Sequence, residues 1–264
     1  MDIRGSFVSS DWIIETDQLT KEFRGFAAVR GVSLKVRRHS IHALIGPNGA
    51  GKTTCFNLIT RFLAATSGRI LYQGRDITLC APADIARLGM VRSFQISAVF
   101  LAMTVRDNIR VALQRKLGTS FHFWKNLASL DGLNPVAAAL AEQVGLADFL
   151  DTPAVALSYG RKRALEIATT LALEPEMLLL DEPMAGLGQE DIWRITQLIR
   201  QIAAGRTVLM VEHNLQVVAQ LSDTITVLAR GEILAEGDYA SVSANPQVIE
   251  AYLGSSATAG TGHG

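Results

Sequence analysis

The stretch from Gly46 to Thr53 reads GPNGAGKT and fits the pattern G-x-x-x-x-G-K-[S/T], in which x is any residue. Ile41 to Ile45, directly before it, is an apolar-rich run typical of a buried strand, and Lys52 to Arg61 has the pattern of a helix. In such a strand–loop–helix the glycines let backbone N–H groups point inward, and the helix N-terminus adds a positive dipole. The stretch therefore predicts a loop that holds phosphate groups.

The side chains of this loop have separate expected roles. Lys52 would reach the β- and γ-phosphates of a nucleotide, and the Thr53 hydroxyl would ligate Mg²⁺. Thr54 would contact the α-phosphate, with an ordinary first-turn helix residue as the alternative interpretation. The predicted phosphate-binding residues are Gly46, Pro47, Asn48, Gly49, Ala50, Gly51, Lys52, Thr53 and Thr54.

A second apolar run ends in two consecutive carboxylates. Met177 to Asp181 is typical of a buried strand, and Glu182 follows it. Because side chains alternate along a strand, Asp181 and Glu182 should face different sides. Asp181 would then hold Mg²⁺ through water, and Glu182 would orient or deprotonate the water that attacks the γ-phosphate. Such a pair alone is more often a solvated turn or a helix cap, but the phosphate loop upstream favours the functional interpretation.

The remaining pattern predicts alternating strands and helices around a helical middle third. The predicted strands are Val32–Val36, Ile41–Ile45, Arg69–Tyr72, Met177–Asp181, Thr207–Glu212 and Thr224–Ala229. Further helices should follow the cap residue Thr104, begin at Asn134-Pro135, and run from about Lys162 to Leu173. Alternating strands and helices imply a largely parallel sheet with ligands at the carboxyl ends of its strands.

Length and composition narrow the class of protein. The 264 residues are 48% hydrophobic, so the chain can build a large core and is not intrinsically disordered. Lys and Arg number 25 against 25 Asp and Glu, and this balance is unfavourable for general nucleic-acid binding. Two cysteines are too few for a disulfide framework or a zinc set. Neither a membrane-spanning run nor a signal peptide is evident, which predicts a chain that stays in the cytosol.

A second helix start carries the sequence that points to a family. Leu157 to Arg161 reads LSYGR, and Ser158 is well placed to cap the helix that follows. Here the chain resembles the ATP-binding subunits of ABC transporters, whose signature is usually written LSGGQ. Tyr159 replaces the first glycine and Arg161 the glutamine. The resemblance implies that Ser158 and Gly160 contact ATP.

Other positions match the same family in order. Gln95 resembles the glutamine that senses Mg²⁺ and the γ-phosphate and touches the membrane subunit. His213 resembles the histidine that contacts the γ-phosphate. Phe23 matches the aromatic residue that stacks on adenine, with a plain core aromatic as the alternative. Ala185 to Gly188 is similar to the loop after the catalytic glutamate, although Gly188 lacks the usual Asn or Asp side chain.

The resemblance covers Trp12 to Gly254 and implies an α/β fold of the ABC ATPase type. That fold has a P-loop NTPase core with a mostly parallel sheet, an N-terminal antiparallel β subdomain and a helical insertion subdomain at about 96–176. The expected domain organisation is an N-terminal extension at 1–11, a single domain at 12–254 and a disordered tail at 255–264. The implied activity is ATP hydrolysis coupled to solute transport, with ATP and Mg²⁺ as cofactors.

Three features resemble the branched-chain amino acid importers within this family: the Tyr159 signature, the helical stretch Leu113–Leu150 and the closing segment Asn245–Gly254. This resemblance implies a head-to-tail dimer with a second ABC ATPase, a paralogue or another copy, at the cytoplasmic face of the membrane. Integral membrane permeases would be direct partners, and a periplasmic solute-binding protein an indirect one.

Several alternatives stay open at this point. The transported solute could instead be urea, an amide or an aromatic acid, or the chain could serve lipopolysaccharide-type export. An ABC ATPase acting on nucleic acid or ribosomes typically has two fused ATPase units or long coiled coils, whereas this chain has one phosphate loop and no heptad run. A small-molecule P-loop kinase would not need Leu157–Arg161 or His213.

Overall fold

The computed structural model describes residues 11–93, 99–116 and 132–258, which form two compact units. The first unit joins Met1–Pro82 to Ser222–Gly264, and the second is Ala83–Leu221. The second unit is therefore an insertion in the sequence of the first. Gln95 and the final residues 259–264 lie outside the described residues.

An antiparallel sheet forms the N-terminal part of the first unit. Strand β1 pairs with β2, β3 and β5, and β5 pairs with β6, all antiparallel. The strands are β1 (Trp12–Phe23), β2 (Phe26–Val32), β3 (Lys35–Arg37), β5 (Ser67–Tyr72) and β6 (Arg75–Asp76). This arrangement confirms the predicted antiparallel subdomain.

The predicted single strand Val32–Val36 is wrong, because the chain leaves the sheet between β2 and β3. The Thr16 side chain takes over the hydrogen bonding there: its Oγ1 donates to the Val32 carbonyl and accepts from the Leu34 N–H, both at 2.8 Å. The Leu34 carbonyl still accepts from the Thr16 N–H at 2.8 Å, but Ser33 and Leu34 are not strand residues, so the predicted strand divides in two.

The rest of the first unit places the phosphate loop. The fully buried strand β4 (Ile41–Ile45) pairs in parallel with β10 (Thr224–Ala229), and β10 pairs antiparallel with β11 (Glu232–Gly237). Helix α1 (Lys52–Ile59) starts after the loop. It ends two residues earlier than predicted, because Arg61 adopts a left-handed conformation with φ of 60°.

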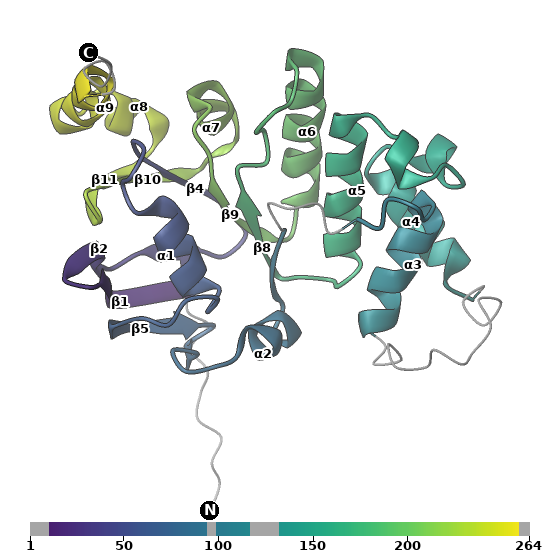
Figure 1. Ribbon diagram of the computed structural model, residues 1–264, viewed down its shortest axis with the longest axis horizontal. Helices are drawn as coiled ribbons and strands as arrows, with labels where there is room; N and C mark the ends of the chain where they lie inside the picture. The colour runs from purple at the N-terminus through teal and green to yellow at the C-terminus, as the bar shows by residue number, and fades with distance from the viewer. Residues whose placement is uncertain (1–10, 94–98, 117–131, 259–264) are drawn as a thin grey trace, which may run out of the picture. The chain divides into compact units, whose positions relative to one another are not determined.

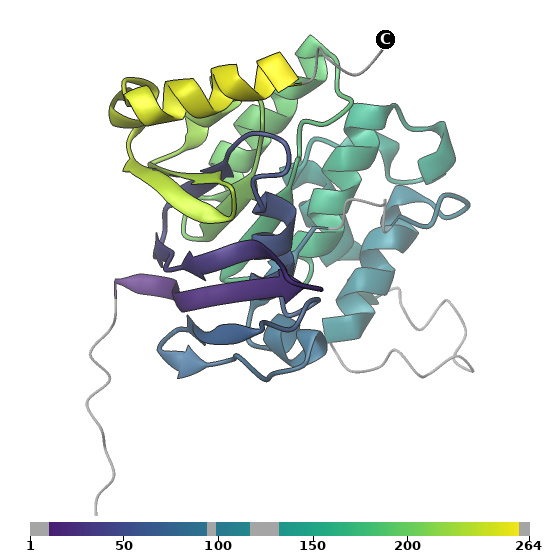
Figure 2. The ribbon, with the colours of Figure 1, turned by 60° about the vertical axis from the view of Figure 1, so that its left-hand side comes forward.

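Two helices close the described part of the first unit. They are α8 (Tyr239–Ser243) and α9 (Pro246–Thr258). Helix α9, in yellow in Figure 2, lies along the β10–β11 hairpin. Helix α9 extends four residues past the expected start of the disordered tail, since Ser255 to Thr258 continue its last turns.

The second unit combines a parallel sheet with helices. Strands β7 (Met90–Arg92), β8 (Met177–Asp181) and β9 (Thr207–Val211) are parallel neighbours in that order. The helices are α2 (Pro82–Arg87), α3 (Val105–Lys116), α4 (Asn134–Gln143), α5 (Tyr159–Leu171), α6 (Gln189–Ile202) and α7 (Leu215–Leu221), with the short turns η2 (Ala147–Phe149) and η3 (Ala154–Ala156). Figure 1 shows α3, α4 and α5 packed together and α5 beside α6.

Local signals account for these helices. The Thr104 Oγ1 accepts from the Asp107 N–H at 3.1 Å and donates to the Asp107 carboxylate at 2.8 Å, which confirms the predicted cap of α3. Ser158 caps α5, so that helix begins three residues before the predicted Lys162. In the part of the chain that the structure describes, no helix is long and apolar enough to span a membrane.

Candidate functional site: the phosphate loop and the carboxylate strand

The phosphate loop is folded around its own lysine. The Lys52 Nζ donates hydrogen bonds to the carbonyls of Gly46 at 2.7 Å and Pro47 at 3.0 Å. Lys52 is only 9% exposed, so its ammonium group is held inside the turn of the loop. A positive charge at this place suits the binding of a phosphate group.

Two glycines in the loop are required by close backbone contacts. A Cβ atom on Gly46 would lie 2.1 Å from the Leu228 carbonyl oxygen, and one on Gly51 would lie 2.5 Å from the Ala28 carbonyl oxygen. Gly51 also has φ of 98°, a conformation that L side chains rarely adopt. Gly51 precedes α1, whose start has no side-chain cap and no acidic residue in its first turn, so this end of the helix favours an anion.

Phe23, the residue predicted to stack on adenine, is one of two exposed aromatic residues that lie side by side. Phe23 is 45% exposed, which excludes the alternative of a core aromatic. Its partner across the β1–β2 hairpin is Phe26, which is 64% exposed. Sequence reasoning missed Phe26, although the Arg24-Gly25 turn between two aromatics is a hairpin signal.

The carboxylate strand ends as the sequence predicts. Asp181 is the last residue of β8, and its side chain is 1% exposed and paired with Arg92, whose Nη2 lies 2.5 Å from the Asp181 Oδ2. Glu182 is half-buried and has φ of 46°. A left-handed conformation is uncommon for glutamate, and such strained residues concentrate at functional sites.

A buried carboxylate that sequence reasoning missed joins the loops around Glu182 and His213. Glu212 is fully buried, and its Oε1 accepts from the N–H groups of His213 at 2.8 Å and Asn214 at 3.0 Å. Its Oε2 accepts from the Met184 N–H at 3.3 Å. The His213 ring is exposed, with Nδ1 3.5 Å from the Glu212 carboxylate. Only the tertiary structure reveals this role, because Glu212 reads as a strand residue.

The signature segment begins α5. Ser158 is exposed, and its Oγ accepts from the Arg161 N–H at 3.4 Å. Gly160 is buried, and a Cβ atom there would lie 2.2 Å from the Asp191 carboxyl carbon. The Tyr159 ring lies against Gly186, and the Arg161 guanidinium lies 4.1 Å from the centre of the Phe149 ring. The guanidinium of Arg161 can stack on the Phe149 ring, which the uncharged glutamine of the usual signature would do less well.

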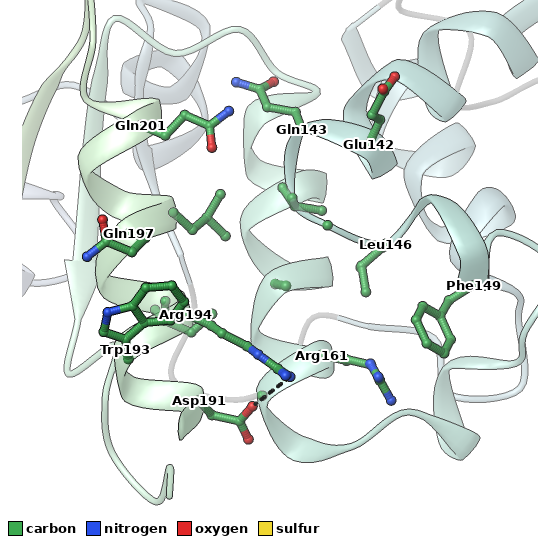
Figure 3. Close-up of a pocket in the computed structure, with 16 residues that line it drawn as sticks. Glu142, Gln143, Leu146, Phe149, Arg161, Asp191, Trp193, Arg194, Gln197 and Gln201 are labelled. Carbon is green, nitrogen blue, oxygen red and sulfur yellow. Dashed lines mark ion pairs between the residues drawn. The ribbon is translucent and has the colours of Figure 1, made fainter. Parts of the chain in front are cut away.

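A pocket of about 470 Å³ lies next to this segment, between α4, α5 and α6. Figure 3 shows Arg161 pointing toward Phe149 on one side and Trp193 on α6 on the other, with Asp191 paired to Arg194. Ser158 is not among the residues that line the pocket.

The predicted site residues fall partly in the first unit and partly in the second. The first unit holds Phe23, the loop Gly46–Thr53 and Thr54, and the second holds Ser158, Gly160, Asp181, Glu182 and His213. Among the described residues, no cluster of three His, Cys, Asp or Glu side chains could hold a metal ion. A Mg²⁺ ion usually has few protein ligands and takes the rest from phosphate and water, so it does not need such a cluster.

Known proteins match this sequence along most of its length. The ABC transporter family matches residues 29–185, and the C-terminal family described as branched-chain amino acid ATP-binding cassette transporter matches residues 232–258. The chain therefore belongs to the ABC transporter family and is an ABC ATPase.

Two relatives are high-affinity branched-chain amino acid transport ATP-binding proteins. The chain is 41% identical to BraF of Pseudomonas aeruginosa over 249 residues, covering 92% of this chain and 98% of that protein. It is 37% identical to LivG of Escherichia coli over 250 residues, with the same coverage. An ATP-binding cassette of an ABC transporter in its ADP conformation has a TM-score of 0.81 at 31% identity, covering 92% of this chain and 99% of that one. The predicted fold is confirmed.

Proposed function

We propose that this chain hydrolyses MgATP to power the import of branched-chain amino acids through separate membrane permeases. The observation that supports branched-chain amino acids as the solute is the match of the C-terminal segment, residues 232–258, to the branched-chain amino acid transporter family. Identity of 37–41% with BraF and LivG over almost the whole chain points in the same direction. The chain would lie at the cytoplasmic face of the membrane as a peripheral subunit.

Nucleotide binding falls to the first unit. Phe23 offers an exposed ring on which adenine can stack, and the loop Gly46–Thr53 offers backbone N–H groups to the phosphates. Lys52 would exchange its two loop carbonyls for phosphate oxygens. Because a charged acceptor is stronger than a neutral carbonyl, this exchange favours the nucleotide-bound state.

Residues of the second unit would carry out hydrolysis. Glu182, held in its left-handed conformation, would accept the proton of the attacking water, and His213 would donate a hydrogen bond to the γ-phosphate. Thr53, Gln95 and, through water, Asp181 would hold Mg²⁺. The metal ion, when bound, neutralises charge on the β- and γ-phosphates. Asp181 is already paired with Arg92, so a metal ion held through this carboxylate would have to compete with the guanidinium.

The second half of each site would come from another ATPase subunit in a head-to-tail dimer. Ser158 is exposed at the start of α5, where it can face the nucleotide of a partner. Gly160 has no side chain, so its contact with ATP would be through its backbone, and Asp191 leaves no room there for a Cβ atom.

Solute-stimulated hydrolysis tests the solute assignment. The complete complex, with its permeases, is placed in proteoliposomes with the solute-binding protein, and ATP hydrolysis is measured with leucine, isoleucine or valine. We expect these amino acids to stimulate hydrolysis, and urea, short amides and benzoate to leave it at its basal rate. Stimulation by urea or benzoate alone would refute the solute while leaving the ATPase assignment intact. Absence of hydrolysis in every condition would refute the site.

A further inference from the structure

The pair of Arg92 and Asp181 is placed by the register of two parallel strands. Arg92 ends β7 and lies opposite Leu179 of β8. Leu179 and Asp181 are two residues apart on one strand, so their side chains are on the same face. Arg92 therefore has only to lean along β8 toward its carboxyl end to reach the carboxylate, and its Nη2 lies 2.5 Å from the Asp181 Oδ2.

Burial makes this pair costly to break. The side chains of Arg92 and Asp181 are 11% and 1% exposed, so water screens them little. A carboxylate so deeply buried needs a cation close by, and removing one member of a buried ion pair leaves the other charge uncompensated. A guanidinium does not release its proton under physiological conditions, so only another cation can take its place.

We propose that Arg92 is the resident cation of the Asp181 carboxylate in the nucleotide-free protein and that it competes with Mg²⁺ for this group. The inference rests on the proposed role of Asp181 as a metal ligand. Mg²⁺ alone binds weakly, because it would have to displace Arg92 from its buried partner. MgATP would displace it, because the phosphates would supply further oxygen ligands for the ion. Arg92 thereby couples metal binding to nucleotide binding as a positioning residue.

Divalent-cation binding without nucleotide tests the competition. Mn²⁺ binding is measured by electron paramagnetic resonance, and thermal unfolding is followed with and without Mg²⁺, for the parental chain, Arg92→Gln and Arg92→Lys. Arg87→Gln is the matched control, because Arg87 forms an ion pair with Asp84 at 2.7 Å whose side chains are exposed. We expect Arg92→Gln to bind Mn²⁺ on the order of tenfold or more tightly than the parental chain, and its unfolding temperature to rise with Mg²⁺.

The other variants should separate charge from shape. Arg92→Lys keeps the cation and should remain close to the parental chain, as should Arg87→Gln. Adding Asp181→Asn to Arg92→Gln should abolish the gained Mn²⁺ binding, because the carboxylate is gone. If Arg92→Gln is folded by circular dichroism but gains no Mn²⁺ binding, the proposal is overturned.

The parental protein supplies a test that does not depend on folding of the variants. Tight Mn²⁺ binding by the nucleotide-free parental chain that disappears in Asp181→Asn would also overturn the competition. Failure of the proposed function would look different: Asp181→Asn would then leave MgATP binding and hydrolysis unchanged, whatever Mn²⁺ does without nucleotide.

Discussion

At the scale of single residues, Lys52 can bind either the carbonyls of its own loop or the phosphates of a nucleotide. In the structure it donates to two carbonyls of its own loop. Lys52→Ala removes the charge that would compensate the phosphates, and we expect ATP affinity to fall on the order of tenfold to a hundredfold, together with loss of hydrolysis. Isothermal titration calorimetry measures the first and phosphate release the second. A variant that hydrolyses ATP at close to the parental rate would contradict the assignment of the loop.

Glu182 combines a strained backbone with the expected position of the base. Glu182→Gln keeps the size and hydrogen-bonding reach of the side chain but cannot accept a proton. We expect ATP to bind normally and turnover to fall by about 10² to 10⁴. Nucleotide binding and single-turnover hydrolysis are measured side by side. Loss of ATP binding would instead mark Glu182 as a structural residue, and unchanged turnover would assign the base elsewhere.

His42 predicts a pH dependence of stability. It lies on β4, 1% exposed, and burial lowers its pKa from 6.5 to about 4. Its Nε2 lies 2.7 Å from the Thr226 Oγ1, and Thr226 donates its only hydroxyl hydrogen to Glu236. The His42 Nε2 must therefore be the protonated nitrogen of a neutral ring.

The direction in which stability changes with pH follows from proton uptake by His42. Below pH 6.5 the unfolded chain binds a proton at His42, whereas the folded chain does not bind it until about pH 4. Stability therefore falls as the pH is lowered through this window. Between pH 7.5 and pH 5 we expect the parental chain to lose about 2 kcal/mol more than His42→Gln, in urea unfolding. Carboxylates titrate equally in both proteins. Parallel losses would show that His42 is not the group responsible.

At the scale of elements, sequence patterns predicted the strands whose surroundings are uniform. Strand β4 and strand β8 are buried along their whole length, and both read as plain apolar runs. Strand β1 was not predicted from its sequence pattern. Its pairing with β2 has bulges after Leu19, and Gln18 is left-handed with φ of 49°. Such interruptions shift the side-chain alternation on which strand prediction depends.

Helix α9 makes a contact that no sequence pattern suggests. The Tyr252 hydroxyl forms a hydrogen bond with the Gly46 backbone at the start of the phosphate loop, and burial of Tyr252 raises its pKa. The C-terminal segment that matches the branched-chain amino acid family therefore touches the loop proposed to bind nucleotide. This contact links the part of the chain that distinguishes its subfamily to the part common to the whole family.

Tyr252→Phe tests that link, because it removes only the hydroxyl. The net value of one hydrogen bond is about 0.5–1.5 kcal/mol, so we expect MgATP affinity to fall by about twofold to tenfold. Tyr239→Phe on α8 is the matched control, since that ring is 40% exposed. Calorimetry gives the affinity and urea unfolding the stability of each. If Tyr252→Phe lowers stability but leaves affinity unchanged, the contact supports the fold alone.

At the scale of the whole molecule, the order of motifs predicted the family and the proposed site residues, because each motif is local in sequence. The supporting partners were not predictable. Arg92 meets Asp181 across 89 positions, and Glu212 meets Met184 across 28. Neither Arg92 nor Glu212 belongs to a motif, and only the register of β7, β8 and β9 brings each of them to its partner.

Complementation between two defective chains tests whether ATP sites are shared between subunits. One chain carries Lys52→Ala and the other Ser158→Arg. Ser158 is exposed, so arginine there should block the signature surface at the cost of about 1 kcal/mol for the lost cap. In a mixed head-to-tail dimer one composite site holds both lesions and the other holds neither.

Random mixing in equal amounts makes half of the dimers mixed, each with one intact site, so we expect up to about a quarter of the parental ATPase rate to return. Phosphate release is measured for each chain alone and for the mixture. The matched control mixes Lys52→Ala with Glu182→Gln. In the proposed dimer each subunit supplies its own Lys52 and Glu182 to the same ATP, so every composite site would stay defective. If the first mixture recovers nothing while the parental chain alone turns over ATP at a rate independent of its concentration, the site is complete within one subunit.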